Sequence, residues 1–144
     1  MHGCRQSQRR IYARLQPAGN RDAYAHADRD QDADELVFYD IAASPEARGV
    51  DVSWVKRVSD LLDIPFCVAG GIDSVERARA VLHAGADKVS VNTPALLRPA
   101  LIGELAAAFG SQCVVVGIDS LADSDGEWRV RSHSGDPSKM QAHA

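Results

Sequence analysis

Two short pairs of residues are the positions of this sequence best suited to hold an anion. Gly70-Gly71 follow an apolar run at 64–69, and Asn92-Thr93 follow a second apolar run at 89–91. Glycine has no Cβ, so backbone N–H groups of a glycine pair can come close to a phosphate. The glycine pair alone indicates only a tight turn. Together with Asn92-Thr93 at the end of the next strand, it predicts a phosphate-binding site.

Two aspartates also follow strand-like runs and could transfer protons. Asp119 follows the apolar run at 113–118, which we expect to form a buried strand, and Asp40 follows the run at 36–38. We expect Asp119 to lie in a partly dry mouth, an environment that suits a carboxylate acting as a general acid or base. The alternative is a loop cap that uses its side chain on the Ser120–Leu121 backbone. From the residues alone, these two interpretations are equally supported.

The segment between the two pairs has the pattern of a strand, a turn, a helix and a second strand. Ser74, after Asp73, is a typical helix N-cap, as is Asp51 before the preceding helix. Glu76 lies in the first turn of its helix, where the helix dipole favours an acid. Gly85 is placed to end the helix. Such a unit builds a parallel sheet, in which functional residues gather at the carboxyl ends of the strands.

The same unit recurs along the chain. Strands are predicted to start near residues 36, 65, 88 and 114, which is a spacing of about 25 residues. An eight-unit (β/α) barrel uses about 30 residues per unit. The pattern therefore predicts an α/β fold that is half of a (β/α)8 barrel. A doubly wound sheet is the alternative, but it would place a glycine-rich fingerprint after the first strand, where Ala-Ala-Ser-Pro stands.

The two ends of the chain differ from this pattern. Residues 1–33 hold six arginines and four aspartates, a net charge of +2 against −6 for the remainder. We interpret 1–33 as a disordered leader rather than a basic arm that binds nucleic acid. Residues 34–133 then form the half barrel, with a hairpin turn at Asp125-Gly126, and 134–144 form a flexible tail.

Composition restricts the class of protein. The 144 residues are 45% hydrophobic and carry a net charge of −4, which argues against a nucleic-acid-binding domain. No apolar run approaches the roughly 18–20 residues that a membrane helix needs. Cys4, Cys67 and Cys113 have no spacing typical of a metal site. We therefore expect a cytoplasmic protein with no metal, no cofactor, no nucleic acid and no membrane partner.

Four blocks of sequence resemble one known family. In order, they are ADELVFYDIAAS, IPFCVAGGI, AGADKVSVN and FGSQCVVVGIDS. They are similar to the cyclase (synthase) subunit of imidazole glycerol phosphate synthase, a (β/α)8 barrel of histidine biosynthesis. The resemblance spans about residues 30–141. It implies that ammonia from a partner glutaminase converts a phosphorylated ribonucleotide into imidazole glycerol phosphate and the aminoimidazole carboxamide ribonucleotide.

The resemblance also implies roles for residues at the mouth of the barrel. Asp119 matches the second of the family's two catalytic aspartates. Gly70-Gly71 and Asn92-Thr93 match one of its two phosphate-binding sites. Asp40 matches an acidic residue at the mouth. No cofactor is implied.

Three further residues match positions at the opposite end of the barrel. Glu35 and Lys88 match charged residues of the floor, where ammonia enters in the family, and Asp87 matches a residue that faces the glutaminase. The physical alternative for Glu35 and Lys88 is a solvated salt bridge, which contributes about 0–1 kcal/mol.

The sequence also departs from the family pattern. The first strand, which ends in Cys-Leu-Asp-Val or similar, and the second phosphate site have no counterpart. We expect an incomplete chain, unrelated to the family up to about residue 28, with negligible turnover alone and a tendency of its open sheet to associate. The alternatives are an isomerase-type barrel of the same pathway and a non-catalytic module that binds the glutaminase.

Overall fold

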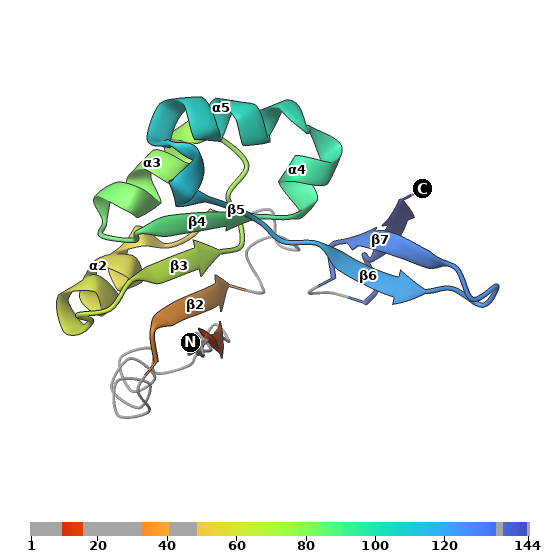
Figure 1. Ribbon diagram of the computed structural model, residues 1–144, viewed down its shortest axis with the longest axis horizontal. Coiled ribbons are helices and arrows are strands. Elements are labelled where there is room, and N and C mark those ends of the chain that lie inside the picture. Colours follow the sequence, from red (N-terminus) through yellow and green to blue (C-terminus); the bar gives the residue numbers. More distant parts are fainter. Residues whose placement is uncertain (1–9, 16–32, 41–48, 135–136, 144) are drawn as a thin grey trace, which may run out of the picture.

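The computed structural model describes residues 10–15, 33–40, 49–134 and 137–143. Most of the expected leader and the loop after Asp40 lie outside these residues. Five parallel strands form one sheet in sequence order (Figure 1): β1 Arg10–Leu15, β2 Glu35–Asp40, β3 Phe66–Ala69, β4 Lys88–Val91 and β5 Val114–Val116. Parallel strands in sequence order need a crossover connection between each strand and the next. From β2 onward, each crossover contains at least one helix.

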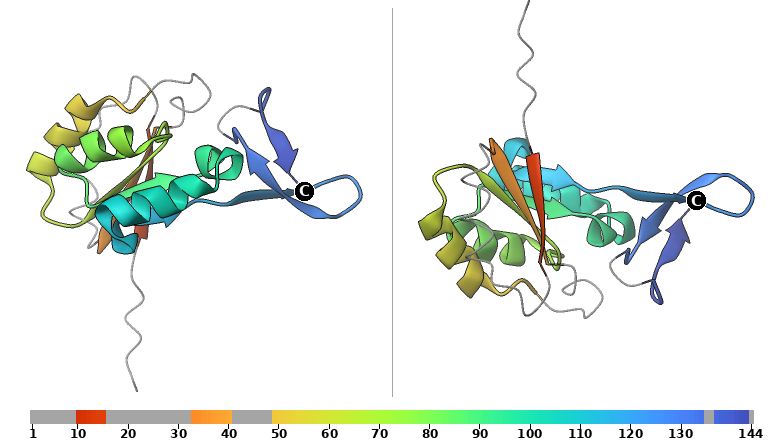
Figure 2. Two further views of the ribbon diagram at one scale, coloured as in Figure 1. Left: turned by 90° about the horizontal axis from the view of Figure 1, so that it is seen from above. Right: turned by 90° about the horizontal axis from the view of Figure 1, so that it is seen from below.

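Helices separate the later strands and cover one face of the sheet (Figure 2): α2 Val52–Leu61, α3 Val75–His83, α4 Thr93–Leu97 and α5 Ala100–Phe109, followed by the 3-10 turn η1 Ser111–Cys113. The predicted caps are confirmed, since the Asp51 side chain accepts from the Ser53 N–H and Ser74 Oγ accepts from the Arg77 N–H. Gly85 follows α3 with φ +112°, as a helix-ending glycine does.

The core lies between the sheet and these helices. Strand residues on the covered face are buried, and they alternate with residues of the opposite face, as a pleated strand requires. Phe38 is fully buried at the centre, with its ring centroid 5.8 Å from that of Trp54 and 6.0 Å from that of Phe66. One strand–helix layer thus packs as in part of a (β/α) barrel, although the described residues do not close into one.

The C-terminal part forms a second, smaller sheet. Its antiparallel strands are β6 Asp119–Ala122, β7 Trp128–Ser132 and β8 Gln141–His143. The predicted hairpin turn joins β6 to β7, and Gly126 there has φ +81°. Figure 1 shows this sheet extending from the end of β5, beyond α4. The hairpin is therefore a long excursion from the carboxyl edge of the parallel sheet.

Three expectations about strands were wrong. β1 lies in the segment expected to lack structure, although Ile11, Ala13 and Leu15 alternate with polar residues there, and β2 supplies its pairing partner. β8 likewise lies in the expected tail, paired with β7. The run at 113–118 is not a buried strand: β5 has three residues and Val116 is 42% exposed, because β5 is the outer strand of the described sheet. The domain boundaries themselves stay a prediction.

The described helices are all short. None of them combines the length and the apolar character that a bilayer crossing would need.

Candidate active site

A cavity of about 550 Å³ lies where the carboxyl ends of β2, β3 and β4 meet the hairpin of β6 and β7. We call it the edge pocket. All six residues predicted for the mouth are among those that line it: Asp40, Gly70, Gly71, Asn92, Thr93 and Asp119. Residues up to 79 positions apart in the sequence thus meet at one edge of the sheet, as the strand-end argument requires.

Gly70 is a glycine for a steric reason. Its φ is +106°, and a Cβ built on it would lie 2.3 Å from the carbonyl oxygen of Asp40. Gly71 also has positive φ, +63°. The chain therefore turns sharply at the end of β3, with its backbone close to the end of β2. Only a residue without a Cβ fits this approach.

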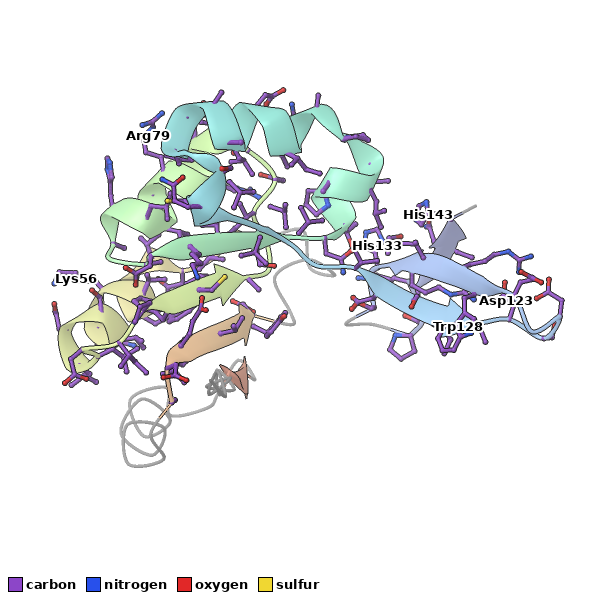
Figure 3. The ribbon with its side chains drawn as sticks, viewed as in Figure 1. Lys56, Arg79, Asp123, Trp128, His133 and His143 are labelled. Atoms are coloured by element: carbon purple, nitrogen blue, oxygen red, sulfur yellow. The ribbon has the colours of Figure 1, made fainter. Side chains whose placement is uncertain are left out.

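Asn92 and Thr93 join the strand ends to the hairpin. Thr93 begins α4, and its Oγ1 accepts a hydrogen bond of 2.9 Å from the His133 N–H. Figure 3 labels His133 at the end of β7 that is nearer to α4. Asn92 Nδ2 donates to Asp119 Oδ2 at 2.6 Å. The Asn92 Oδ1 atom is buried and has no hydrogen-bond partner among the described residues. These contacts fix the hairpin over the pocket.

Asp119 differs from the expectation in two ways. It begins β6 instead of ending β5, and it is exposed instead of partly dry, because the hairpin leaves the sheet at this point. Both hydrogen bonds that its carboxylate receives, from Asn92 Nδ2 and from the Ser134 hydroxyl, go to Oδ2. One carboxylate oxygen is thus held by side chains, and Oδ1 accepts no hydrogen bond that the described residues provide. These bonds come from side chains and not from the Ser120–Leu121 backbone, so they differ from the loop cap of our alternative, and the catalytic role stays a prediction.

The hairpin contributes pocket residues that the sequence argument missed. Arg131, His133 and Ser134 line the edge pocket. The alternation of arginines along residues 128–131 was visible, but the register that pairs Arg131 with Asp119 was not. Register depends on the turn and on packing, so a single strand pattern does not provide it.

An ion cluster stiffens the hairpin beside these residues. Asp123 accepts hydrogen bonds from Arg129 and from Arg131, and Arg129 also donates to Asp125. The bond from Arg129 and then that from Arg131 lower the pKa of Asp123 below its ordinary value. The carboxylate is therefore ionised near neutral pH, and the cluster stays charged.

The charged residues expected at the floor lie at the beginnings of the strands, away from the edge pocket. Lys88 Nζ donates to Glu35 Oε1 at 2.6 Å, and the two side chains are 33% and 16% exposed. This pair is more buried than the solvated bridge of our alternative. Asp87 is exposed, but its carboxylate accepts the Phe66 N–H at 2.9 Å, so it also holds the start of β3.

Cys67 lies beside this pair, outside the core that packs against the helices, and is 1% exposed. Burial, and to a lesser extent the Glu35 carboxylate, raises its pKa from 9.0 to about 12, while Lys88 acts in the opposite direction. Below pH 9 the thiol is protonated in both the folded and the unfolded chain. Between pH 9 and about 12 the unfolded chain loses the proton first, so stability falls as the pH rises.

We therefore expect wild type to lose about 1.4 kcal/mol more unfolding free energy than Cys67→Ala per pH unit above 9. Urea denaturation at pH 8 and pH 10 measures this difference. At pH 8 the thiol is protonated, so the difference in unfolding free energy between the two proteins reflects only the packing lost in Cys67→Ala. That difference is the baseline for pH 10. Parallel pH profiles for the two proteins would contradict the assigned burial of the thiol.

The described residues hold no cluster of three or more His, Cys, Asp or Glu side chains suited to a metal ion. The residues that line the edge pocket offer glycine backbone N–H groups, amide and hydroxyl side chains, carboxylates, one imidazole and one guanidinium. A parallel strand–helix layer with this pocket at its carboxyl edge defines the class: part of a (β/α) barrel with a strand-end site.

Comparison with known proteins assigns the family. The family described as "Histidine biosynthesis protein" matches residues 8–143, and the chain belongs to it. The match begins before β1, nearer the N-terminus than we expected.

Relatives include imidazole glycerol phosphate synthase subunit HisF of Xanthomonas campestris pv. campestris (strain 8004), 74% identical over 114 residues. The same-named subunit of Stenotrophomonas maltophilia (strain K279a) is 73% identical over 114 residues. Each alignment covers 79% of this chain and 44% of the relative. The chain thus spans less than half the length of these relatives.

Proposed function

We propose that this chain serves the cyclase reaction of imidazole glycerol phosphate synthase, with the edge pocket as the binding place of the phosphorylated ribonucleotide. The observation that carries the proposal is that Gly70, Gly71, Asn92, Thr93 and Asp119 line one cavity. The name shared by the 73–74% identical relatives supports the choice of reaction.

In this proposal the phosphate lies against the ends of β3 and β4. Gly70, Gly71 and Thr93 all line the pocket, and the backbone N–H groups of the two glycines would contact the anion without hindrance from a Cβ. Binding through backbone groups needs a rigid turn. The close approach of Gly70 to the Asp40 carbonyl supplies that rigidity.

Asp119 is the proton-transferring group of the proposal. Asn92 and Ser134 hold its Oδ2, which leaves Oδ1 for the reacting part of the ligand. A carboxylate held in one orientation transfers protons with less reorganisation. Asp40, which is 3% exposed, shapes the mouth from the end of β2.

The opposite end of the sheet is the proposed entrance for ammonia. Glu35 and Lys88 form its charged pair, and Asp87 lies beside them on an exposed surface where a glutaminase would dock to form a heterodimer. The proposal needs no metal and no cofactor, and it places the reaction in the cytoplasm.

Calorimetry with imidazole glycerol phosphate tests the proposal. We expect binding that is at least about tenfold weaker for the dephosphorylated compound, because charged hydrogen bonds to phosphate are lost. Gly71→Ala should weaken binding, whereas Gly126→Ala, which also has positive φ but lies in the hairpin turn, should not. Equal affinity for both compounds would contradict the proposal.

Two alternatives predict other outcomes. An isomerase-type barrel would consume its ribonucleotide substrate without ammonium. A non-catalytic module would bind the glutaminase in a pull-down but would not bind imidazole glycerol phosphate.

A further inference from the structure

We propose that Arg131, on the hairpin, supplies the positive charge that holds the ligand's phosphate in the edge pocket. The inference rests on the proposed function for the class of ligand, an organic phosphate. It adds a residue that neither the strand-end argument nor the family resemblance assigned.

The charge distribution of the edge pocket is the first step. Asp40 and Asp119 contribute carboxylates, and among the described residues that line the pocket Arg131 has the only side chain with a permanent positive charge. A phosphate entering beside two carboxylates needs a cation nearby, because backbone N–H groups carry only partial charges. Arg131 is the lining residue that meets this need.

The burial of Arg131 is the second step. It is 9% exposed, which is unusual for an arginine, and its Nε is buried without a hydrogen-bond partner among the described residues. An unsatisfied buried donor is unfavourable unless a ligand or water completes it. Phosphate oxygens are suitable acceptors, since a guanidinium binds them with two parallel hydrogen bonds.

The position of Arg131 is the third step. It pairs across the hairpin with Asp119, yet its Nη2 donates to Asp123 and not to Asp119. Asp123 therefore keeps the guanidinium from neutralising the proposed catalytic carboxylate. Two residues further on, the His133 N–H donates to Thr93 Oγ1, which ties this strand end to the proposed phosphate-binding edge.

Calorimetry with ribose 5-phosphate, and with ribose as the neutral probe, tests the inference. We expect Arg131→Met to weaken ribose 5-phosphate binding about tenfold or more, without effect on ribose, and Arg131→Lys to restore part of the loss. Arg129→Met is the matched control: Arg129 also binds Asp123 but does not line the pocket. The affinity of Arg129→Met for ribose 5-phosphate should stay within about twofold of wild type. A loss as large as that of Arg131→Met would show that both variants act through the stability of the hairpin, and would contradict the inference.

The outcomes separate the inference from the proposed function. If wild type prefers ribose 5-phosphate over ribose and Arg131→Met binds it equally well, the inference falls and the proposed function stands. If wild type shows no preference for the phosphate, both fall. Should Arg131→Met lose its circular dichroism signal, the Arg131 Nε–H resonance of wild type decides: a downfield shift at saturating ribose 5-phosphate supports the inference, and an unmoved resonance overturns it.

Discussion

Replacement of Gly70 by alanine is expected to lower the free energy of unfolding by about 2–4 kcal/mol. A non-glycine residue at strongly positive φ costs about 1–3 kcal/mol, and the new Cβ would lie 2.3 Å from the Asp40 carbonyl oxygen, so the backbone must also shift. The shift moves the turn that lines the edge pocket, and phosphate binding should weaken with it. Urea denaturation followed by circular dichroism measures the stability change.

Two other glycines separate the causes of this effect. Gly126 also has positive φ, +81°, but a Cβ there meets nothing within 4 Å, so Gly126→Ala should show the strain alone, about 1 kcal/mol. Gly103 lies in α5 with open space around it, and Gly103→Ala should stabilise by about 0.5–1 kcal/mol. Equal changes at Gly70 and Gly126 would refute the close approach between the ends of β2 and β3.

Truncation of Phe38 to alanine is expected to cost about 3–5 kcal/mol, the range found for buried aromatic residues. Phe38 is fully buried and its ring packs on those of Trp54 and Phe66, so the change leaves a cavity between the sheet and α2. Because marginal domains have only about 5–15 kcal/mol of stability, much of the population should unfold. Guanidinium denaturation measures the loss.

The matched control is an aromatic residue outside the core. Trp128 in β7 is 71% exposed, and Trp128→Ala should change the stability by no more than about 0.5 kcal/mol. A comparable loss from Phe38→Ala and Trp128→Ala would mean that the sheet–helix interface is not the main core.

Local signals were sufficient for the central elements of the fold. The N-caps Asp51 and Ser74 and the helix end at Gly85 are confirmed, because capping depends on residues only a few positions apart. β1 and β8 were missed because short strands of mixed polarity are stabilised by the neighbours with which they pair. Burial of β5 was overestimated for the same reason: an apolar run does not reveal whether a strand lies at an edge.

The residues of the candidate site also fall into two groups, those that local sequence predicts and those that depend on tertiary structure. The strand-end rule placed Gly70-Gly71 and Asn92-Thr93 at one edge from sequence alone, because parallel strands share their direction. It could not place Arg131 or Ser134, which reach the pocket only through the register of β6 with β7 and the bond between His133 and Thr93. Exposure of Asp119 likewise depends on where the hairpin leaves the sheet.

Backbone amide shifts during titration with imidazole glycerol phosphate test the central claim most directly, because they locate the phosphate on the chain. If the carboxyl edge binds it, the largest shifts in a ¹H–¹⁵N spectrum should fall at Gly70, Gly71 and Thr93. Shifts centred instead on Glu35 and Lys88, at the other end of the strands, or no saturable shifts, would contradict the account.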